Sequence, residues 1–386
     1  MRETPAPGKG GRNGALTYHP AMSAVSRLPT TLGRAASVMV VIAVAATVAT
    51  FGLRLAGATS VPVFIVAAIA LAGLAGVVGS GTDQLGQRLG PGATGVLQSA
   101  LGNLPELFIS LFALRSGLVV LVQTALIGSI LANSLLVLGL AFLAGGLRNG
   151  VQTFGKGPIR MIATLLVLAV AAIAIPTVAT APGGPDAGHA RDLSVVCAVV
   201  LLIVFFASIP FSIGGGPGAS AVDTEDQERW PLKLAIGLLV SAAVAAAFVS
   251  DWFVEALRPA MAALGMSEAF VGLVIVAIAG NAVENVVGVQ MAMRNRTDLA
   301  ISLILNSGLQ VALAMTPALV LASIVIGGPA LTLVLPAFLI AAVALAVILG
   351  SLIVYDGEST WLEGLALIGL YVIIAASVWW GPRIQT

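Results

Sequence analysis

The chain alternates between long apolar stretches and short polar breaks. A helix needs about 20 mostly apolar residues to cross the hydrocarbon core of a bilayer, and eleven stretches of this sequence approach or exceed that length. Because backbone groups surrounded by lipid must form their hydrogen bonds within the segment, each stretch is predicted to be a helix. The predicted helices cover residues 37–54, 61–80, 93–114, 119–147, 159–180, 193–212, 232–253, 268–293, 299–326, 330–354 and 361–381.

Composition indicates the same class of protein. Apolar residues occupy 59% of the 386 positions and charged residues only 9%, whereas a soluble domain carries about 25% charged residues. Membrane lipid is therefore the expected partner. The 18 basic and 17 acidic residues nearly cancel, so charge gives no indication of a nucleic-acid partner. A single cysteine, Cys197, excludes an internal disulfide and a cysteine metal site. The sequence leaves the oligomeric state open.

The positions of Lys and Arg predict the orientation. With the N-terminus in the cytosol, thirteen of them fall in inner segments and five in outer segments, which is the bias expected of cytosolic loops. The basic, Gly- and Pro-rich residues 1–36 are interpreted as a disordered cytosolic tail rather than a signal peptide. We expect an integral, multi-pass protein of the plasma membrane of a bacterium, with its C-terminus outside.

An internal repeat divides the chain. Residues 102–106 read GNLPE, and residues 280–284 read GNAVE, 178 positions further on. A serine follows each motif 23 residues after its glutamate, as Ser129 and Ser307. Five helices remain in each half once the first is set aside, and this odd number reverses the direction in which the second copy enters the membrane. Inverted repeats with a site near the midplane are a transporter architecture.

The predicted fold is therefore an all-α membrane protein of about eleven transmembrane helices, with one N-terminal helix before two inverted five-helix repeats. The predicted parts are the tail (1–36), the first transmembrane helix (37–58), the first repeat (59–213), an acidic cytosolic loop (214–231) and the second repeat (232–386). The acidic loop lacks the spacing of an EF-hand and is interpreted as a solvated segment. Its acidic residues are Asp223, Glu225, Asp226 and Glu228.

Glu106 and Glu284 are the candidate functional residues. A carboxylate at the centre of a membrane helix costs about 2.5–3.5 kcal/mol even on the lenient insertion scale, so it indicates a functional site. Two carboxylates held close in low dielectric cannot both stay charged unless a divalent cation or protons compensate. Competition of cation and protons for the same oxygens would couple their fluxes. The alternative is structural, because a membrane glutamate can simply pair with an arginine or with a backbone group.

The residues next to the glutamates favour a cation site. Asn103 and Asn281 each precede a glutamate by three positions, so each pair is predicted to share a helix face. Pro105 removes a helix hydrogen bond and is expected to free the carbonyl of Leu101. Oxygen ligands in a flexible arrangement suit Ca²⁺ better than Mg²⁺. Glu106 and Glu284 are the predicted metal ligands, with two glycines that permit bending, Gly102 and Gly280.

Further polar residues in apolar stretches are predicted to line the site, although Ser and Asn also hold membrane helices together. These residues are Gln123, Ser129, Asn133, Asn306, Ser307 and Gln310. Asp83 is predicted to be an interfacial residue at the cytosolic end of the second helix. His19 and His189 are placed in a tail and a loop, so neither is a predicted metal ligand.

The motifs together resemble the calcium/cation antiporter superfamily in its cation/proton-exchanger branch. The resemblance spans residues 60–381 and rests on residues 102–115 (GNLPELFISLFALR), 127–139 (IGSILANSLLVLG), 267–278, 280–313, 356–357 (DG) and 361–364 (WLEG). It implies Ca²⁺/H⁺ exchange by alternating access, with the two glutamates as the ligand pair and Gln310 close by. No enzymatic activity and no cofactor is implied; the transported ions are Ca²⁺ and H⁺.

One position departs from the resemblance. Many members of that branch have a histidine after the second glutamate, where this chain has Asn285. An amide does not titrate, so Asn285 is a candidate coupling position whose effect on ion choice stays open.

Two alternatives remain. A Na⁺/H⁺ or K⁺/H⁺ exchanger of the same fold fits the pattern, although two carboxylates favour a divalent ion. An intramembrane aspartyl protease is a distant alternative suggested by Tyr355 and Asp356, but no Gly-x-Gly-Asp partner accompanies them.

Overall fold

The computed structural model describes residues 32–89, 101–185, 188–213, 230–327 and 329–379. Residues 1–31 of the predicted tail lie outside these ranges, and so does the predicted acidic run with Asp223, Glu225, Asp226 and Glu228. Besides helices, the described residues form turns, one extended segment and two short antiparallel strands. The strands are β1 (Gln152–Thr153) and β2 (Glu358–Ser359).

The helices follow the predicted apolar stretches. In chain order they are α2 (Arg34–Leu55), α3 (Ser60–Leu89), α5 (Leu104–Arg115), α6 (Val119–Leu131), α7 (Leu138–Asn149), α8 (Lys156–Ala179), α9 (Ala190–Ile213), α10 (Leu232–Leu264), α11 (Glu268–Phe270), α12 (Ala277–Gly280), α13 (Ala282–Met293), α14 (Thr297–Gln310), α15 (Thr316–Ile326), α16 (Ala337–Ile353) and α17 (Trp361–Trp379). Three π-helical stretches connect α6 to α7, α11 to α12 and α14 to α15. They are η1 (Ala132–Val137), η2 (Val271–Val276) and η3 (Val311–Met315).

The described residues contain eight helices long and apolar enough to cross a membrane, and a bent pair that would make a ninth. That pair is Glu268–Gly280 with Glu284–Met293, bent by 61°. Ala337–Ile353 is apolar but shorter, and the predicted span 93–114 falls partly outside the described residues. Large apolar side chains on α2, α9 and α10 are exposed, such as Val48, Ile203 and Phe248, as lipid-facing helices require. The count of eleven stays a prediction.

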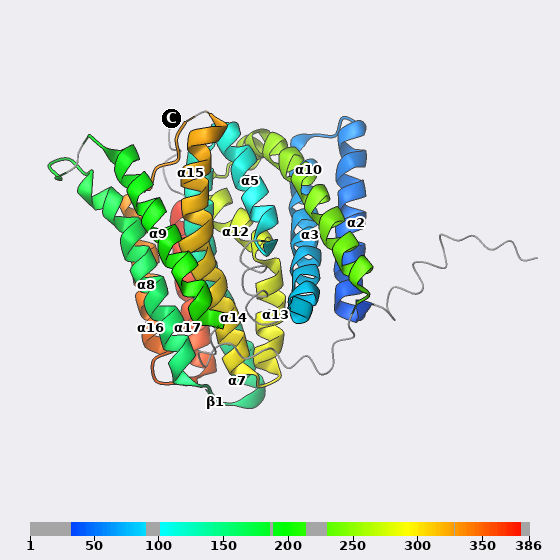
Figure 1. Cartoon of the computed structure of the whole chain (residues 1–386). Coiled ribbons are helices and arrows are strands. Elements are labelled where there is room, and N and C mark those ends of the chain that lie inside the picture. The colour runs from blue at the N-terminus through cyan, green and yellow to red at the C-terminus, as the bar shows by residue number, and fades with distance from the viewer. Residues whose placement is uncertain (1–31, 90–100, 186–187, 214–229, 328, 380–386) are drawn as a thin grey trace, which may run out of the picture.

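Three helices pack together at one side of the molecule. α3 contacts both α2 and α10, and α10 runs obliquely across α3 in Figure 1. A Cβ atom at Gly73 would lie 2.9 Å from the backbone of Ala43, so the close contact of α3 with α2 requires glycine there. Nη1 of Arg54 binds Oε2 of Glu255 at 2.6 Å and joins one end of α2 to α10. At the other end, the Trp230 ring nitrogen donates to the Leu32 carbonyl at 3.3 Å.

The remaining helices interleave the two halves of the chain. α6 of the first half contacts η2 of the second, and α7 contacts both α13 and α17. A Cβ atom at Gly128 would overlap the backbone of Leu273, so α6 and η2 touch backbone to backbone. The two halves therefore share one apolar core rather than folding as separate units.

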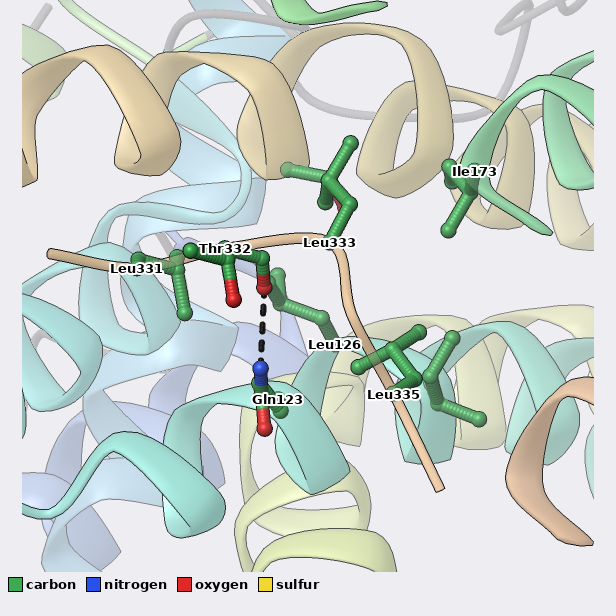
Figure 2. A pocket seen from close by; sticks show the side chains of 9 residues that line it. Gln123, Leu126, Ile173, Leu331, Thr332, Leu333 and Leu335 are labelled. Carbon is green, nitrogen blue, oxygen red and sulfur yellow. Dashed lines mark hydrogen bonds between the residues drawn. The ribbon is translucent and has the colours of Figure 1, made fainter. Parts of the chain in front are cut away.

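The predicted helix 330–354 begins later than expected. Residues 329–336 are extended, and α16 begins at Ala337, after Pro336. Leu331, Leu333 and Leu335 are buried in alternation with half-buried residues. The hydropathy of the segment suggested a helix because an alternating strand and a helix can be equally apolar. Figure 2 shows the segment beside Gln123 of α6.

Side chains from four helices provide the hydrogen bonds that this extended backbone lacks. The amide nitrogens of Leu331, Leu333 and Leu335 donate to hydroxyls of Ser323, Ser194 and Thr177 at 3.0, 2.9 and 2.9 Å. Nε2 of Gln123 donates to the carbonyls of Thr332 at 2.8 Å and Val334 at 3.1 Å (Figure 2). Non-helical backbone at membrane depth requires such partners. Gln123 therefore holds this segment, contrary to its predicted place at the site.

The second predicted helix is also longer than expected. It was predicted to end at residue 80, and α3 continues to Leu89. Polar side chains of this last part are not exposed: Thr82 and Gln84 are buried and Asp83 is half-buried. The drop in hydropathy after Gly79 reflects contacts with protein rather than the membrane surface.

We predict that Gln123→Leu lowers the thermal midpoint of the protein in detergent. The variant removes the donor to two carbonyls, and an unsatisfied acceptor costs about 1–3 kcal/mol, or a shift of roughly 2–4 °C per kcal/mol. Gln290→Leu is the matched control because the Gln290 side chain is exposed. Equal midpoints for Gln123→Leu and the parent would show that these bonds do not stabilise the fold.

Candidate functional site

The two repeated motifs adopt the same backbone conformation. Asn103 precedes α5 with φ −99° and ψ 20°, and Asn281 precedes α13 with φ −96° and ψ 25°. Each asparagine interrupts a helical path, and its carbonyl accepts the first hydrogen bond of the next helix, from Leu107 at 2.9 Å and Asn285 at 3.0 Å. The second half breaks even though it lacks a proline.

Pro105 has a different role from the predicted one. It lies in the first turn of α5, where a missing N–H removes no helix hydrogen bond and the fixed φ favours helix initiation. The interruption at Gly102 and Asn103 already separates Leu101 from the helix. Pro105 therefore begins a helix rather than disturbing one.

Glu106 and Glu284 each lie in the first turn of the helix that follows a break. The unpaired N–H groups at a helix N-terminus carry a partial positive charge that favours a carboxylate. α5 lies above α13 in Figure 1, and α12 lies beside their junction. The breaks thus place two helix N-termini inside the protein, one from each half.

Glu106 is completely buried. Its Oε1 accepts a hydrogen bond from the Ser129 hydroxyl, while its Oε2 has no hydrogen-bond partner among the described residues. A Cβ atom at Gly280 would lie 3.1 Å from this Oε2 and 3.2 Å from the Glu106 Cβ. The glycine of the second motif therefore packs directly on the glutamate of the first.

A polar network links the two halves beside Glu106. Asn133 Nδ2 donates to Asn281 Oδ1 at 2.9 Å, and Asn281 Nδ2 donates to Ser129 Oγ at 3.1 Å. Ser129 in turn donates to Glu106, so each group donates to the next toward the carboxylate, an arrangement in which hydrogen bonds strengthen one another. Ser307 Oγ also donates to Asn281 Oδ1, at 3.3 Å.

Glu284 lies next to this network and is half-buried. It interacts electrostatically with Glu106 and Asp83, and Ser307 lies nearby. The Ser307 hydroxyl donates to Asn281 Oδ1, whereas the Ser129 hydroxyl donates to the glutamate of its own half. Asp83, which was predicted to be interfacial, interacts electrostatically with Glu284. It lies within α3, which continues to Leu89 rather than ending at residue 80.

The other predicted residues have varied surroundings. Asn103 and Gln310 are buried, and Gly102 and Asn306 are half-buried. The hydrogen bonds among described residues join none of these side chains to the network. Asn285 Nδ2 donates to the Ile278 carbonyl at 3.4 Å, and its Oδ1 is buried without a partner.

The unsatisfied atoms of the site share one chemistry. Glu106 Oε2, Asn133 Oδ1 and Asn285 Oδ1 are buried oxygen acceptors without a donor in the described structure. Buried polar atoms without partners are rare in native proteins and require an explanation. Oxygen atoms of carboxylates and amides are ligands of hard cations, so the arrangement fits a cation that binds between the halves.

The fold is that of a membrane protein in which polar side chains of both halves surround a buried carboxylate. Comparison with known proteins gives the family. The model of the family described as "Sodium/calcium exchanger protein" matches residues 59–214 and 234–380. The chain therefore belongs to the sodium/calcium exchanger protein family. This membership confirms the resemblance noted in the sequence and the prediction of an integral, multi-pass transporter rather than an enzyme, which removes the protease alternative.

Curated relatives cover most of the chain. A Ca²⁺/H⁺ antiporter of Aphanothece halophytica is 34% identical over 340 residues, which cover 83% of this chain and 91% of the relative. The Ca²⁺/H⁺ antiporter ChaA of Bacillus subtilis is 35% identical over 323 residues, covering 82% and 91%.

Solved structures share the architecture. The structure of native YfkE matches with a TM-score of 0.77 and 31% identity, over 88% of this chain and 99% of that one. A crystal structure of the H⁺/Ca²⁺ exchanger CAX matches with a TM-score of 0.68 at 15% identity, over 88% of this chain and 91% of that one, and supports the fold alone.

We predict that Gly280→Ala lowers cation transport in vesicles by up to roughly tenfold, since Glu106 must shift by a few tenths of an ångström and small misplacements of a reacting group slow the reaction. The added methyl group would press on the Glu106 carboxylate, which has little room to move. Gly237→Ala on α10 is the control because nothing lies within 4 Å of its Cβ position. Parent-like transport by Gly280→Ala would contradict the tight packing of this glycine on Glu106.

Proposed function

We propose that this protein exchanges Ca²⁺ for H⁺ across the membrane, with Glu106 and Glu284 binding the cation or protons in turn. The observation that carries the proposal is the buried Glu106 Oε2 without a partner, in a site to which both halves contribute. The names of the curated relatives, two Ca²⁺/H⁺ antiporters, support the choice of ions.

Electrostatics supports competition between the two ions. Glu106 and Glu284 interact with each other, and two nearby carboxylates in low dielectric favour a state in which positive charge is added. Within the described ranges no basic side chain forms an ion pair with either glutamate. The positive charge that compensates the two carboxylates would then come from exchangeable ions, either one Ca²⁺ or protons bound to the same oxygens.

Ca²⁺ fits the ligand set better than the alternatives. It accepts six to eight oxygens in irregular geometry, whereas Mg²⁺ needs a near-ideal octahedron. The two carboxylates would be assisted by Asn103, Asn281 and Asn133 and by carbonyls at the helix breaks. A Na⁺/H⁺ or K⁺/H⁺ exchanger of the same fold remains the second candidate, since carboxylates also bind monovalent ions.

Two features support alternating access between inverted repeats. The motifs at 102–106 and 280–284 have matching backbone conformations at their asparagines. In each half a π-helical stretch also follows the repeated serine, η1 between α6 and α7 and η3 between α14 and α15. Interrupted helices that meet at the repeat interface are typical of secondary transporters. The expected orientation has the N-terminus in the cytosol, and Asn285 is the expected coupling position.

We predict that Glu106→Gln and Glu284→Gln each abolish exchange while the protein still folds and inserts. Glutamine keeps the size and hydrogen bonding of the side chain but removes the charge that binds the cation. Transport is measured in proteoliposomes, and insertion by yield and size-exclusion profile. Glu358→Gln is the control because Glu358 is exposed on β2. Parent-like transport by either site variant would remove that glutamate from the ligand set.

We also predict that an acid-inside pH gradient drives uptake of Ca²⁺ into these vesicles in preference to Na⁺ or K⁺. Outward movement of protons supplies the free energy, and the divalent ion best satisfies two carboxylates. Ion-selective indicators report each cation separately. Sodium or potassium uptake without a calcium signal would establish the second candidate instead.

A further inference from the structure

Asp83 is an acidic residue close to the site that the proposed function does not use. It lies in the last two turns of α3 and interacts electrostatically with Glu284. α3 contacts both α12 and α13, the helices on either side of Asn281, and the Asp83 side chain is half-buried. Its carboxylate is therefore near Glu284 inside the bundle.

The polar neighbours of Asp83 along α3 are engaged elsewhere. Arg88 donates to the carbonyl of Trp230, and Gln84 Oε1 accepts from the Trp230 backbone N–H at 2.9 Å. Across the described ranges no basic side chain forms an ion pair with Asp83. A carboxylate in this setting makes the electrostatic potential near Glu284 more negative, since no fixed cation neutralises it.

Three carboxylates follow one another from the end of the bundle inward. Asp83 interacts with Glu284, and Glu284 interacts with Glu106, whose Oε2 is buried without a partner. α3 and α13 run toward the same end of the molecule, the lower end in Figure 1. The series thus leads from that end to the unsatisfied oxygen.

The opposite end has a different arrangement. There one acidic residue of α10, Glu255, forms an ion pair with Nη1 of Arg54 at 2.6 Å, and this fixed partner neutralises its charge. Asp83 has no such ion-pair partner among the residues that the structure describes.

We infer that Asp83 is the entry residue for the transported cation: it attracts the cation at the end where α3 and α13 terminate and increases its occupancy at Glu284. Charges of one sign on low-dielectric walls concentrate counter-ions and raise their local concentration by tenfold or more. The inference rests on the proposed function, and it makes the two sides of the membrane unequal in apparent affinity for the cation.

The test compares Ca²⁺ transport in right-side-out and inside-out membrane vesicles. Asp83→Asn is expected to raise the half-saturating Ca²⁺ concentration roughly tenfold when Ca²⁺ reaches the α3 end, and to leave it unchanged from the opposite side. The maximal rate is expected to stay near the parent value, because the glutamate pair is intact. Asp83→Glu is expected to restore the parent concentration dependence.

Glu255→Gln is the matched control, since it removes an acid that already has a fixed basic partner. Asp83→Ser serves as a second neutral variant if Asp83→Asn does not insert. An unchanged half-saturating concentration in the neutral variants, an equal change from both sides, or the same change in Glu255→Gln would overturn the inference. A parent protein that takes up no Ca²⁺ under any pH gradient would instead overturn the proposed function.

Discussion

Negative charge buried without fixed positive charge is the constraint on which the arrangement of this protein depends. Glu106 is fully buried and receives one side-chain hydrogen bond, from Ser129. Burying an ionised carboxylate is expensive unless it is paired, and no basic side chain in the described ranges forms an ion pair with Glu106. The fold supplies hydroxyl groups, amides and helix N-termini, which lower the cost only in part. A cation or protons that bind and dissociate can offset the remaining free-energy cost of burying the carboxylate, and an exchanger requires such reversible binding.

The helix breaks lower the cost of burying the two glutamates, but they also leave backbone groups that need hydrogen-bond partners. Beginning a helix after Asn103 or Asn281 places the partial positive charge of its N-terminus beside a glutamate, but it also leaves backbone groups that lipid cannot satisfy. The protein buries both breaks among helices of the other half, as the contact of Gly280 with Glu106 shows. The interleaving of the halves therefore follows from the site. Separate bundles would expose the breaks.

The sequence predicted the helices and the pairing of motifs because hydropathy and spacing are local properties. An offset of 178 residues relates both the glutamates and the serines, and in the structure Ser129 donates to Glu106. The prediction from sequence was wrong where tertiary contacts replace lipid. Residues 329–336 are as apolar as a helix, yet side chains such as Gln123 and Thr177 stabilise them as an extended segment. Asp83 was predicted to be interfacial because the polar residues after Gly79 resemble the end of a membrane helix. The hydropathy pattern of one helix does not show which other helices pack against it.

The two motifs are similar in sequence and backbone conformation, but their asparagine side chains form different hydrogen bonds. Asn281 binds Ser129, Asn133 and Ser307, while the side chain of Asn103 forms no hydrogen bond within the described residues. Both asparagines have the same backbone conformation, so the difference arises from the side chains around them. A site with identical surroundings in both halves would have no preferred side of the membrane. Because the hydrogen bonds around Asn281 and Asn103 differ, the surroundings of the site are not the same toward the two ends of the molecule in this conformation.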